Sequence, residues 1–242
     1  MNIHRRAGAI FIAIFSLAIG VHANPIITVF NTGVGPSGTP LPDFTIGDPH
    51  YHLISVPGGT TDIQVRTSAG GFPVGLWLGD NSLSAWIGPN NPSNNDPAAV
   101  GEPGIFTYRT TFDLSGWVAS TASIAGEVAS DNWLVDVQLN GMSLGITTGF
   151  EDFGFFTPFT ITTGFIDGIN TLDFVVRNGS GPTGLRVQMT GSADLSAGGP
   201  GTVPDGSATA GLIGFAWLGF ATISLMNHRA RGRCRISSGQ AL

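Results

Sequence analysis

The second half of the chain alternates apolar and polar residues with a period of two, and this pattern limits the fold more than any other feature. Residues 105–114 place four large apolar side chains on one side of an extended chain, with Thr, Arg and Asp residues between them. The same alternation runs through residues 133–139, 172–177 and 185–190. A period of two indicates half-buried β-strands. No amphipathic helical stretch of useful length appears, so the pattern predicts an all-β protein.

Turn residues separate the predicted strands. Asn140-Gly141 follows directly on residues 133–139 and predicts a type I′ hairpin turn, because both residues accept positive φ. Asn178-Gly179 predicts a further hairpin turn. Fainter strands are expected at residues 26–30, 52–56 and 63–66, and long loops in the Pro-, Asn- and Gly-rich residues 70–104. Roughly eight or nine strands in one unit predict an antiparallel jelly roll or β-sandwich.

The amino terminus has the features of an export signal. Arg5 and Arg6 precede the apolar residues 7–21, and Val21-His22-Ala23 is a small-residue cleavage site. We therefore expect a signal peptide over residues 1–23, with a mature ectodomain over residues 24–196 outside the cytoplasm. The alternative is an uncleaved anchor.

The carboxyl terminus contains an uncharged apolar run over residues 208–226. Its length is close to the ~20 residues that a helix needs to cross a bilayer, and apolar residues occupy every face. The basic residues that follow are Arg229, Arg231, Arg233 and Arg235. The positive-inside bias puts them in the cytoplasm. The pattern predicts one transmembrane helix followed by a basic cytoplasmic tail, residues 227–242; the alternative is a buried helix of a soluble domain.

The ectodomain is strongly acidic. All 16 Asp and Glu residues lie between residues 24 and 207, where four arginines oppose them and the whole chain has no lysine, which gives a net charge of about −12. Such a surface excludes nucleic acid and anionic membrane surfaces as partners. The single cysteine, Cys234, lies in the predicted tail, so no disulfide supports the ectodomain.

Residues 197–207 form a Gly- and Pro-rich linker that contains Val203-Pro204-Asp205 before Gly206-Ser207. With the apolar run and the arginines, this signature resembles the PEP-CTERM class of bacterial sorting domains, in its Val-Pro-Asp variant. The resemblance implies processing by an exosortase and delivery to the cell surface or the exopolysaccharide matrix. The tail departs from that pattern because it continues past the arginines to Leu242.

A second resemblance covers about residues 104–195. Several segments, in this order, look like a galactose-binding-domain-like jelly roll: Tyr108–Leu114, Asp131-Asn132, Val137–Gly141, Phe165–Leu172 and Gly184–Val187. Sugar-binding modules attached to glycoside hydrolases run in the same order. The resemblance implies a sandwich fold, and such modules often hold a structural Ca²⁺. No Ca²⁺ ligands can be assigned in this sequence.

Four tryptophans, Trp77, Trp86, Trp117 and Trp133, could stack on pyranose rings. Trp133 begins an alternating strand, which favours the core. Trp77 and Trp86 flank Gly79-Asp80-Asn81 in the loop-rich region, where aromatic rings beside hydrogen-bonding side chains would suit a sugar. We predict a ligand site at Trp77, Asp80, Asn81 and Trp86; the alternative is that these tryptophans anchor the loop.

The sequence offers few candidate residues for metal binding or catalysis. His50 and His52 lack a third zinc ligand, and Glu151-Asp152 is read as a solvated loop rather than a Ca²⁺ site. No Gly-x-Ser-x-Gly motif occurs, and nothing pairs Glu127 with another acid. We therefore expect no enzyme and no cofactor, but a surface or matrix protein with polysaccharide as its candidate ligand. The alternatives are a glycan hydrolase with an unrecognised acid pair, and an interaction module without a small ligand.

Overall fold

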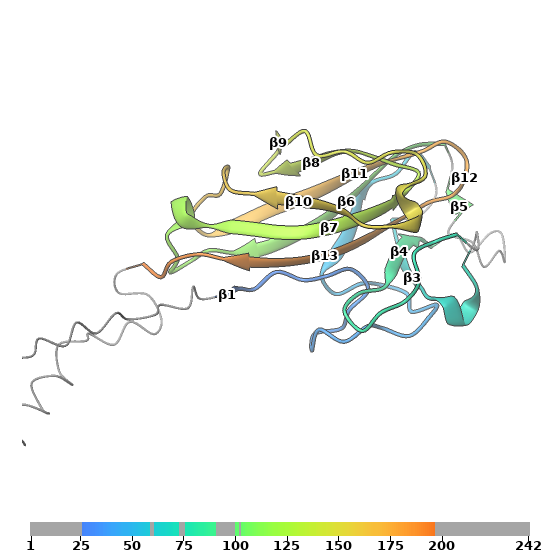
Figure 1. Ribbon diagram of the computed structural model, residues 1–242, viewed down its shortest axis with the longest axis horizontal. Coiled ribbons are helices and arrows are strands. Elements are labelled where there is room, and N and C mark those ends of the chain that lie inside the picture. The colour runs from blue at the N-terminus through green and yellow to red at the C-terminus, as the bar shows by residue number, and fades with distance from the viewer. Residues whose placement is uncertain (1–25, 59–60, 73–75, 91–99, 102, 197–242) are drawn as a thin grey trace, which may run out of the picture. The chain divides into compact units, whose positions relative to one another are not determined.

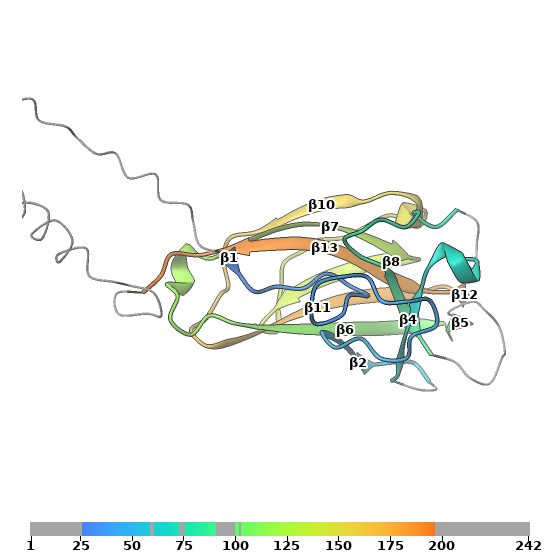
Figure 2. The same ribbon diagram turned by 90° about the horizontal axis from the view of Figure 1, so that it is seen from below.

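The computed structural model describes residues 26–58, 61–72, 76–90, 100–101 and 103–196, which form a sandwich of two antiparallel sheets (Figures 1 and 2). The first sheet has the order β10-β7-β13-β4-β3, and β1 also pairs with β13. Its strands are β1 (Ile26–Ile27), β3 (Ile63–Arg66), β4 (Trp86–Pro89), β7 (Ser123–Asp131), β10 (Thr157–Ile161) and β13 (Gly184–Ser192).

The second sheet has the order β2-β6-β11-β8-β9. Its strands are β2 (Tyr51–Ser55), β6 (Gly104–Asp113), β8 (Trp133–Leu139), β9 (Met142–Ser143) and β11 (Ile169–Asn178). A separate pair joins β5 (Val100–Gly101) and β12 (Gly181–Pro182). Three short 3₁₀ turns complete the described residues: η1 (Ser68–Gly70), η3 (Ala119–Thr121) and η4 (Asp152–Gly154). The all-β sandwich prediction is confirmed.

The main core lies between the two sheets and explains the alternation in the sequence. Phe106, Tyr108 and Phe112 of β6 face inward together with Phe174 of β11, and all are buried. The buried apolar side chains of this cluster all come from residues 27–193 of the described chain. This cluster of the described residues therefore lies within the predicted ectodomain, residues 24–196.

The hairpin turn at Asn140-Gly141 is confirmed, with φ of 54° and 79° between β8 and β9. The hairpin predicted at Asn178-Gly179 is wrong. The chain passes from β11 of the second sheet through the short β12, which pairs with β5, into β13 of the first sheet. This segment therefore crosses from one layer of the sandwich to the other. Local turn residues are compatible with both connections, and the pairing is set by burial in the opposite sheets.

The expectation of long loops throughout residues 70–104 is also wrong in part. β4 lies within this stretch and pairs with β3 and β13, so Trp86 belongs to a strand inside the first sheet. The alternation is hidden there because all four residues of β4 are buried, on both faces of the sheet.

Several predicted segments lie outside the described residues: the signal peptide, the linker, the transmembrane helix and the basic tail. Among the described ranges, no helix has the length and apolar character needed to cross a membrane.

Candidate functional site

The loop predicted to bind a ligand builds a second, smaller core on the outer face of the first sheet. Trp77 is 4% exposed and Trp86 is 0% exposed, and their rings stack with centroids 4.3 Å apart. Ala129 completes the buried cluster, and Phe153 and Phe156 from around η4 pack on it. The two indoles therefore contact each other and their own sheet, which differs from the exposed platform expected from the sequence.

Arg186 fastens this loop to the sheet. Its guanidinium is buried beneath the loop and donates to the carbonyl oxygens of Leu78 and Gly79, at 3.0 and 2.6 Å. It also donates to the hydroxyl and carbonyl oxygens of Ser84, at 2.8 and 3.1 Å. Burial lowers the pKa of Arg186, and the carboxylates of Asp80 and Glu127 oppose that shift.

The polar residues of the predicted site, Asp80 and Asn81, form hydrogen bonds within the loop. Asp80 is exposed and accepts hydrogen bonds from the backbone N–H and the hydroxyl of Ser68. The Asn81 side-chain oxygen accepts the N–H groups of Leu83 and Ser84, at 2.9 and 3.1 Å, as in an Asx turn. A ligand role for Trp77, Asp80, Asn81 and Trp86 stays a prediction, and what the structure assigns to them is packing and turn formation.

Asp131 links the second core to the crossing between β7 and β8. One carboxylate oxygen accepts Trp77 Nε1–H at 2.7 Å, and the other accepts the Asn132 amide at 2.7 Å. Asn132 in turn accepts the backbone N–H of Gly179 at 2.7 Å. Burial raises the pKa of Asp131 to about 6, although the bond from Trp77 acts in the opposite direction. The structural role expected for Asp131-Asn132 agrees with these contacts.

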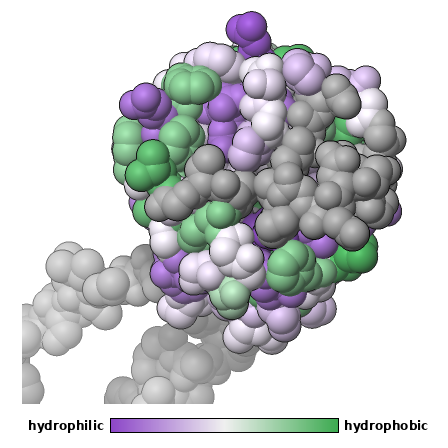
Figure 3. Space-filling view, turned by 90° about the vertical axis from the view of Figure 1, so that its right-hand side faces the viewer, coloured by the Kyte–Doolittle hydropathy of each residue, from purple (hydrophilic) through white to green (hydrophobic). Residues whose placement is uncertain are grey.

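Trp133 is only half-buried, unlike the core residue expected at this position. Its ring lies 4.8 Å from that of Phe150, and the Arg177 guanidinium lies 5.1 Å from its centroid. Phe150 is 48% exposed, so this cluster lies at the surface. Figure 3 shows the end of the molecule that carries η1 and η4, where small hydrophobic patches alternate with hydrophilic residues over the described part.

The remaining candidates are separated. His50 stacks on Phe30 at 3.5 Å, whereas His52 is exposed on β2. Asp152 accepts the backbone N–H of Gly149 at 2.6 Å within its loop. Within the described residues, no group of three or more His, Cys, Asp or Glu side chains is placed to hold a metal ion.

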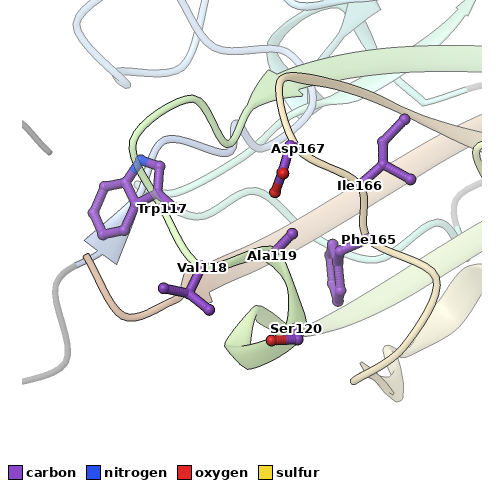
Figure 4. Close-up of a pocket in the computed structure, with 7 residues that line it drawn as sticks. All are labelled: Trp117, Val118, Ala119, Ser120, Phe165, Ile166 and Asp167. Carbon is purple, nitrogen blue, oxygen red and sulfur yellow. The ribbon is translucent and has the colours of Figure 1, made fainter. Parts of the chain in front are cut away.

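An open pocket lies between two loops at the end of the sandwich that carries η3, opposite η1 and η4 (Figures 1 and 4). Its volume is about 600 Å³, within the 300–1,000 Å³ typical of ligand pockets. The residues that line this end pocket are Trp117, Val118, Ala119 and Ser120 from the β6–β7 loop, and Phe165, Ile166 and Asp167 from the β10–β11 loop. In Figure 4 the Asp167 carboxylate points toward the β6–β7 loop.

The β10–β11 loop is held from behind by a buried asparagine. The Asn170 amide donates to the carbonyl oxygens of Ile166 and Gly168, at 2.7 and 2.9 Å. Its side-chain oxygen accepts the Ile166 N–H and the Asn140 amide, at 2.9 and 2.8 Å. Asn170 is 0% exposed, so these bonds fix the loop without using the side chains that face the pocket.

Both aromatic rings of the end pocket rest on the main core. Phe165 meets the buried Phe112 edge-on, with centroids 6.1 Å apart and an interplanar angle of 66°. Trp117 is half-buried against the same core, and its backbone N–H donates to the Leu114 carbonyl at 2.9 Å. Each ring is therefore held in place while part of its surface remains exposed in the pocket.

The sequence contained part of this site. Trp117 is among the four tryptophans that could stack on a sugar, but the predicted site used Trp77 and Trp86, which flank Gly79-Asp80-Asn81. Phe165, Asp167 and Asn170 belong to Phe165–Leu172, one of the segments of the jelly-roll resemblance. The missing information was that two loops 48 residues apart, at Trp117 and Phe165, meet at one end of the sandwich.

No protein-family model and no curated protein matches this sequence. Among solved structures, the chain is similar to a CBM35 from Paenibacillus barcinonensis, with 16% sequence identity and a TM-score of 0.34. The match covers 60% of this chain and 97% of that one. At this level of similarity the module says nothing about what this chain binds.

Proposed function

We propose that the sandwich is a non-enzymatic polysaccharide-binding module of an exported protein, and that it binds a sugar in the end pocket. The observation that carries this proposal is the combination of two anchored aromatic rings, Trp117 and Phe165, with the polar Ser120 and Asp167 in one open hollow. Pockets with apolar walls and a few converging polar groups are the usual form of small-ligand sites.

The chemistry of the lining matches that of a pyranose ring. The C–H-bearing face of the sugar would lie on an aromatic ring, which is large, rigid and polarised. The Asp167 carboxylate and the Ser120 hydroxyl would accept hydrogen bonds from sugar hydroxyls. Both side chains are exposed to solvent, so these bonds would mainly fix the orientation of the sugar and add modestly to the affinity of the stacking contact.

The place of action in this proposal is the cell surface or extracellular matrix, reached through an exosortase that processes the Val203-Pro204-Asp205 signature. Its support is the order of signature, apolar run and arginines in the sequence. We expect that replacing Val203, Pro204 and Asp205 by Ala retains the protein in the inner membrane. Membrane fractionation with mass analysis of the mature carboxyl terminus measures this, and unchanged surface delivery would contradict the sorting proposal.

The binding claim is tested by titrating the fragment 24–196 with the host's purified exopolysaccharide and with neutral oligosaccharides in a calorimeter. Truncating an aromatic residue that dominates a binding site costs about 2 kcal/mol, or roughly 30-fold in affinity. We expect a loss of this size for Trp117→Ala and for Phe165→Ala. The control is Glu151→Gln, an exposed residue beside η4 at the opposite end of the sandwich. Affinity that is unchanged in both aromatic variants would refute the site.

The non-enzymatic part of the proposal is tested by incubating the same fragment with chromogenic glycosides. Glu127 lies half-buried on β7 and Glu151 lies exposed in the loop before η4. We expect no turnover above the rate without protein. Turnover that disappears in Glu127→Gln or Glu151→Gln would make the protein a hydrolase.

A further inference from the structure

We infer that the end pocket selects glycans that carry free amino groups, such as oligomers of glucosamine, and disfavours acidic glycans. This inference rests on the proposed polysaccharide binding and adds the charge class of the ligand. Its basis is the distribution of carboxylates and arginines around the pocket.

Carboxylates gather at this end of the sandwich. Asp167 lines the pocket and is exposed. Asp113 ends β6, where the β6–β7 loop begins, and its carboxylate accepts the Ser115 N–H at 2.7 Å. Asp194 lies beside the same loop, because its carbonyl oxygen accepts the Val118 N–H at 2.8 Å. Asp167 is the carboxylate that lines the pocket, and Asp113 and Asp194 add negative charge at the same end of the sandwich.

The arginines of the described residues are used elsewhere. Arg109 forms a two-point ion pair with Asp173 on the outer face of the second sheet, with both N–O distances 2.7 Å. Arg177 lies over Trp133, Arg186 is buried under the loop of the second core, and Arg66 lies over the Phe44 ring at 4.3 Å. None of these four residues lines the end pocket, and the chain contains no lysine.

The two charge classes of glycan would therefore respond differently. An ammonium group on the sugar can pair with Asp167 and is attracted by the negative charge at this end of the sandwich. A uronate or sulfate meets repulsion there, and no arginine of the described residues lines the pocket to offset it. Exposed ion pairs contribute about 0.2–1 kcal/mol, so the direct contribution of Asp167 corresponds to at most about a fivefold change in affinity. The preference should weaken at about 1 M salt, where the screening length falls to ~3 Å.

The experiment compares β-1,4-linked oligomers of equal length made of glucose, N-acetylglucosamine or glucosamine, together with an oligogalacturonate. They are titrated into the fragment 24–196 at mildly acidic pH and low salt, where the glucosamine amino groups are protonated. The expected order is glucosamine tightest, the two neutral oligomers weaker, and galacturonate weakest. Asp167→Asn should reduce the affinity for glucosamine by about two- to fivefold more than the affinity for the neutral oligomers, whose hydroxyls keep an acceptor oxygen in the Asn side chain.

Glu151→Gln removes the same charge at the other end of the sandwich and separates local pairing from overall charge. It should keep the preference for glucosamine, and an equal loss in both variants would overturn the inference. Neutral oligomers that bind as tightly as glucosamine, or a tighter galacturonate, would also overturn it. In those cases a loss of neutral binding in Trp117→Ala would still support the proposed function, whereas no binding of any oligomer would refute both.

Discussion

Two regions of this protein place tryptophans near Asp and Ser residues, and the tryptophans have opposite roles in the two regions. In the second core, Trp77 and Trp86 are buried against each other, and the loop above them is tied down by Arg186. In the end pocket, Trp117 and Phe165 rest on the main core with part of each ring exposed. The local residue types are similar, and the difference lies in what fastens each loop.

The hydrogen bonds that fix the second core occupy the indole N–H groups of its tryptophans, which leaves these groups unable to bind a ligand. The Trp77 Nε1–H bonds to Asp131 and the Trp86 Nε1–H bonds to the Leu78 carbonyl, at 2.7 and 3.0 Å. A methyl group at Gly184 would lie 2.9 Å from the Trp77 ring, so even the strand below is shaped to fit it. In the end pocket the fastening comes from behind, through Asn170, and leaves the lining side chains outward. A loop whose side chains are buried and hydrogen-bonded within the protein stabilises the fold. A loop held by a buried residue on its inner side keeps its outer side chains available for binding.

The largest expected effect comes from truncating one tryptophan in each region and comparing the changes in stability and in glycan affinity. Truncation of a buried Trp costs about 3–5 kcal/mol, so Trp86→Ala should lower the free energy of unfolding by about that amount. Trp117→Ala removes a half-buried ring and should cost about 1–2 kcal/mol, while it abolishes most glycan affinity. Urea unfolding and calorimetric titration of both variants measure the two quantities. A Trp86→Ala variant of normal stability without glycan binding would reverse the roles assigned here.

The next effect concerns the pH dependence of stability near the second core. The pKa of Asp131 is raised to about 6 in the folded protein, from 3.8 for an ordinary Asp. The folded state therefore holds the proton on Asp131 more tightly than the unfolded state does. The contribution of Asp131 to the free energy of unfolding is favourable below about pH 4 and is lost as pH rises through about 6. At 1.36 kcal/mol per pKa unit, the change amounts to about 3 kcal/mol.

Urea unfolding between about pH 4.5 and 7 should show this slope, and Asp131→Asn should flatten it. The pKa of Asp48 is also raised by burial, so part of the slope in the native protein has the same sign and remains in the variant. The control is Asp113→Asn, because the bonds from Ser115 lower the pKa of Asp113 and its contribution appears only at more acidic pH. Parallel curves for the native protein and Asp131→Asn would show that the carboxylate is not buried as described.

A smaller loss of stability is expected when the buried Asn170, which supports the β10–β11 loop of the end pocket, is truncated. Asn170→Ala removes the bonds that hold the carbonyl oxygens of Ile166 and Gly168 and leaves the Asn140 amide without this partner. Unpaired buried polar groups cost about 1–3 kcal/mol each, and solvent can reach part of this loop, so we expect a loss of about 2 kcal/mol in unfolding free energy. Glycan affinity should fall with it, because Phe165 and Asp167 are no longer positioned. Full affinity in a destabilised variant would show that the loop needs no such support.

β6 and β8 could be predicted from the sequence because one face of each meets the opposite sheet and the other is partly open to solvent, so buried and partly exposed residues alternate. β13 is buried on both faces over most of its length, but its apolar and polar residue types still alternate. β4 could not be predicted, because both of its faces are covered and the alternation disappears. The crossing at Asn178-Gly179 depends on which sheet each strand joins, and local turn residues do not encode that choice. The end pocket was missed for a related reason, since the contact between the loops of Trp117 and Phe165 is a consequence of the completed sandwich.

The smallest expected effect tests the predicted ligand residues directly. Asp80 is exposed and bonds only within its loop among the described contacts, to the N–H and hydroxyl of Ser68. Asp80→Ala should therefore cost about 1 kcal/mol of stability and leave the affinity for every oligomer unchanged. Urea unfolding measures the stability and the same titrations measure the affinity, with Asp167→Asn as the matched acidic variant of the end pocket. If Asp80→Ala weakens glycan binding at normal stability while Asp167→Asn does not, the sugar binds at the Trp77–Trp86 loop and the two regions exchange roles.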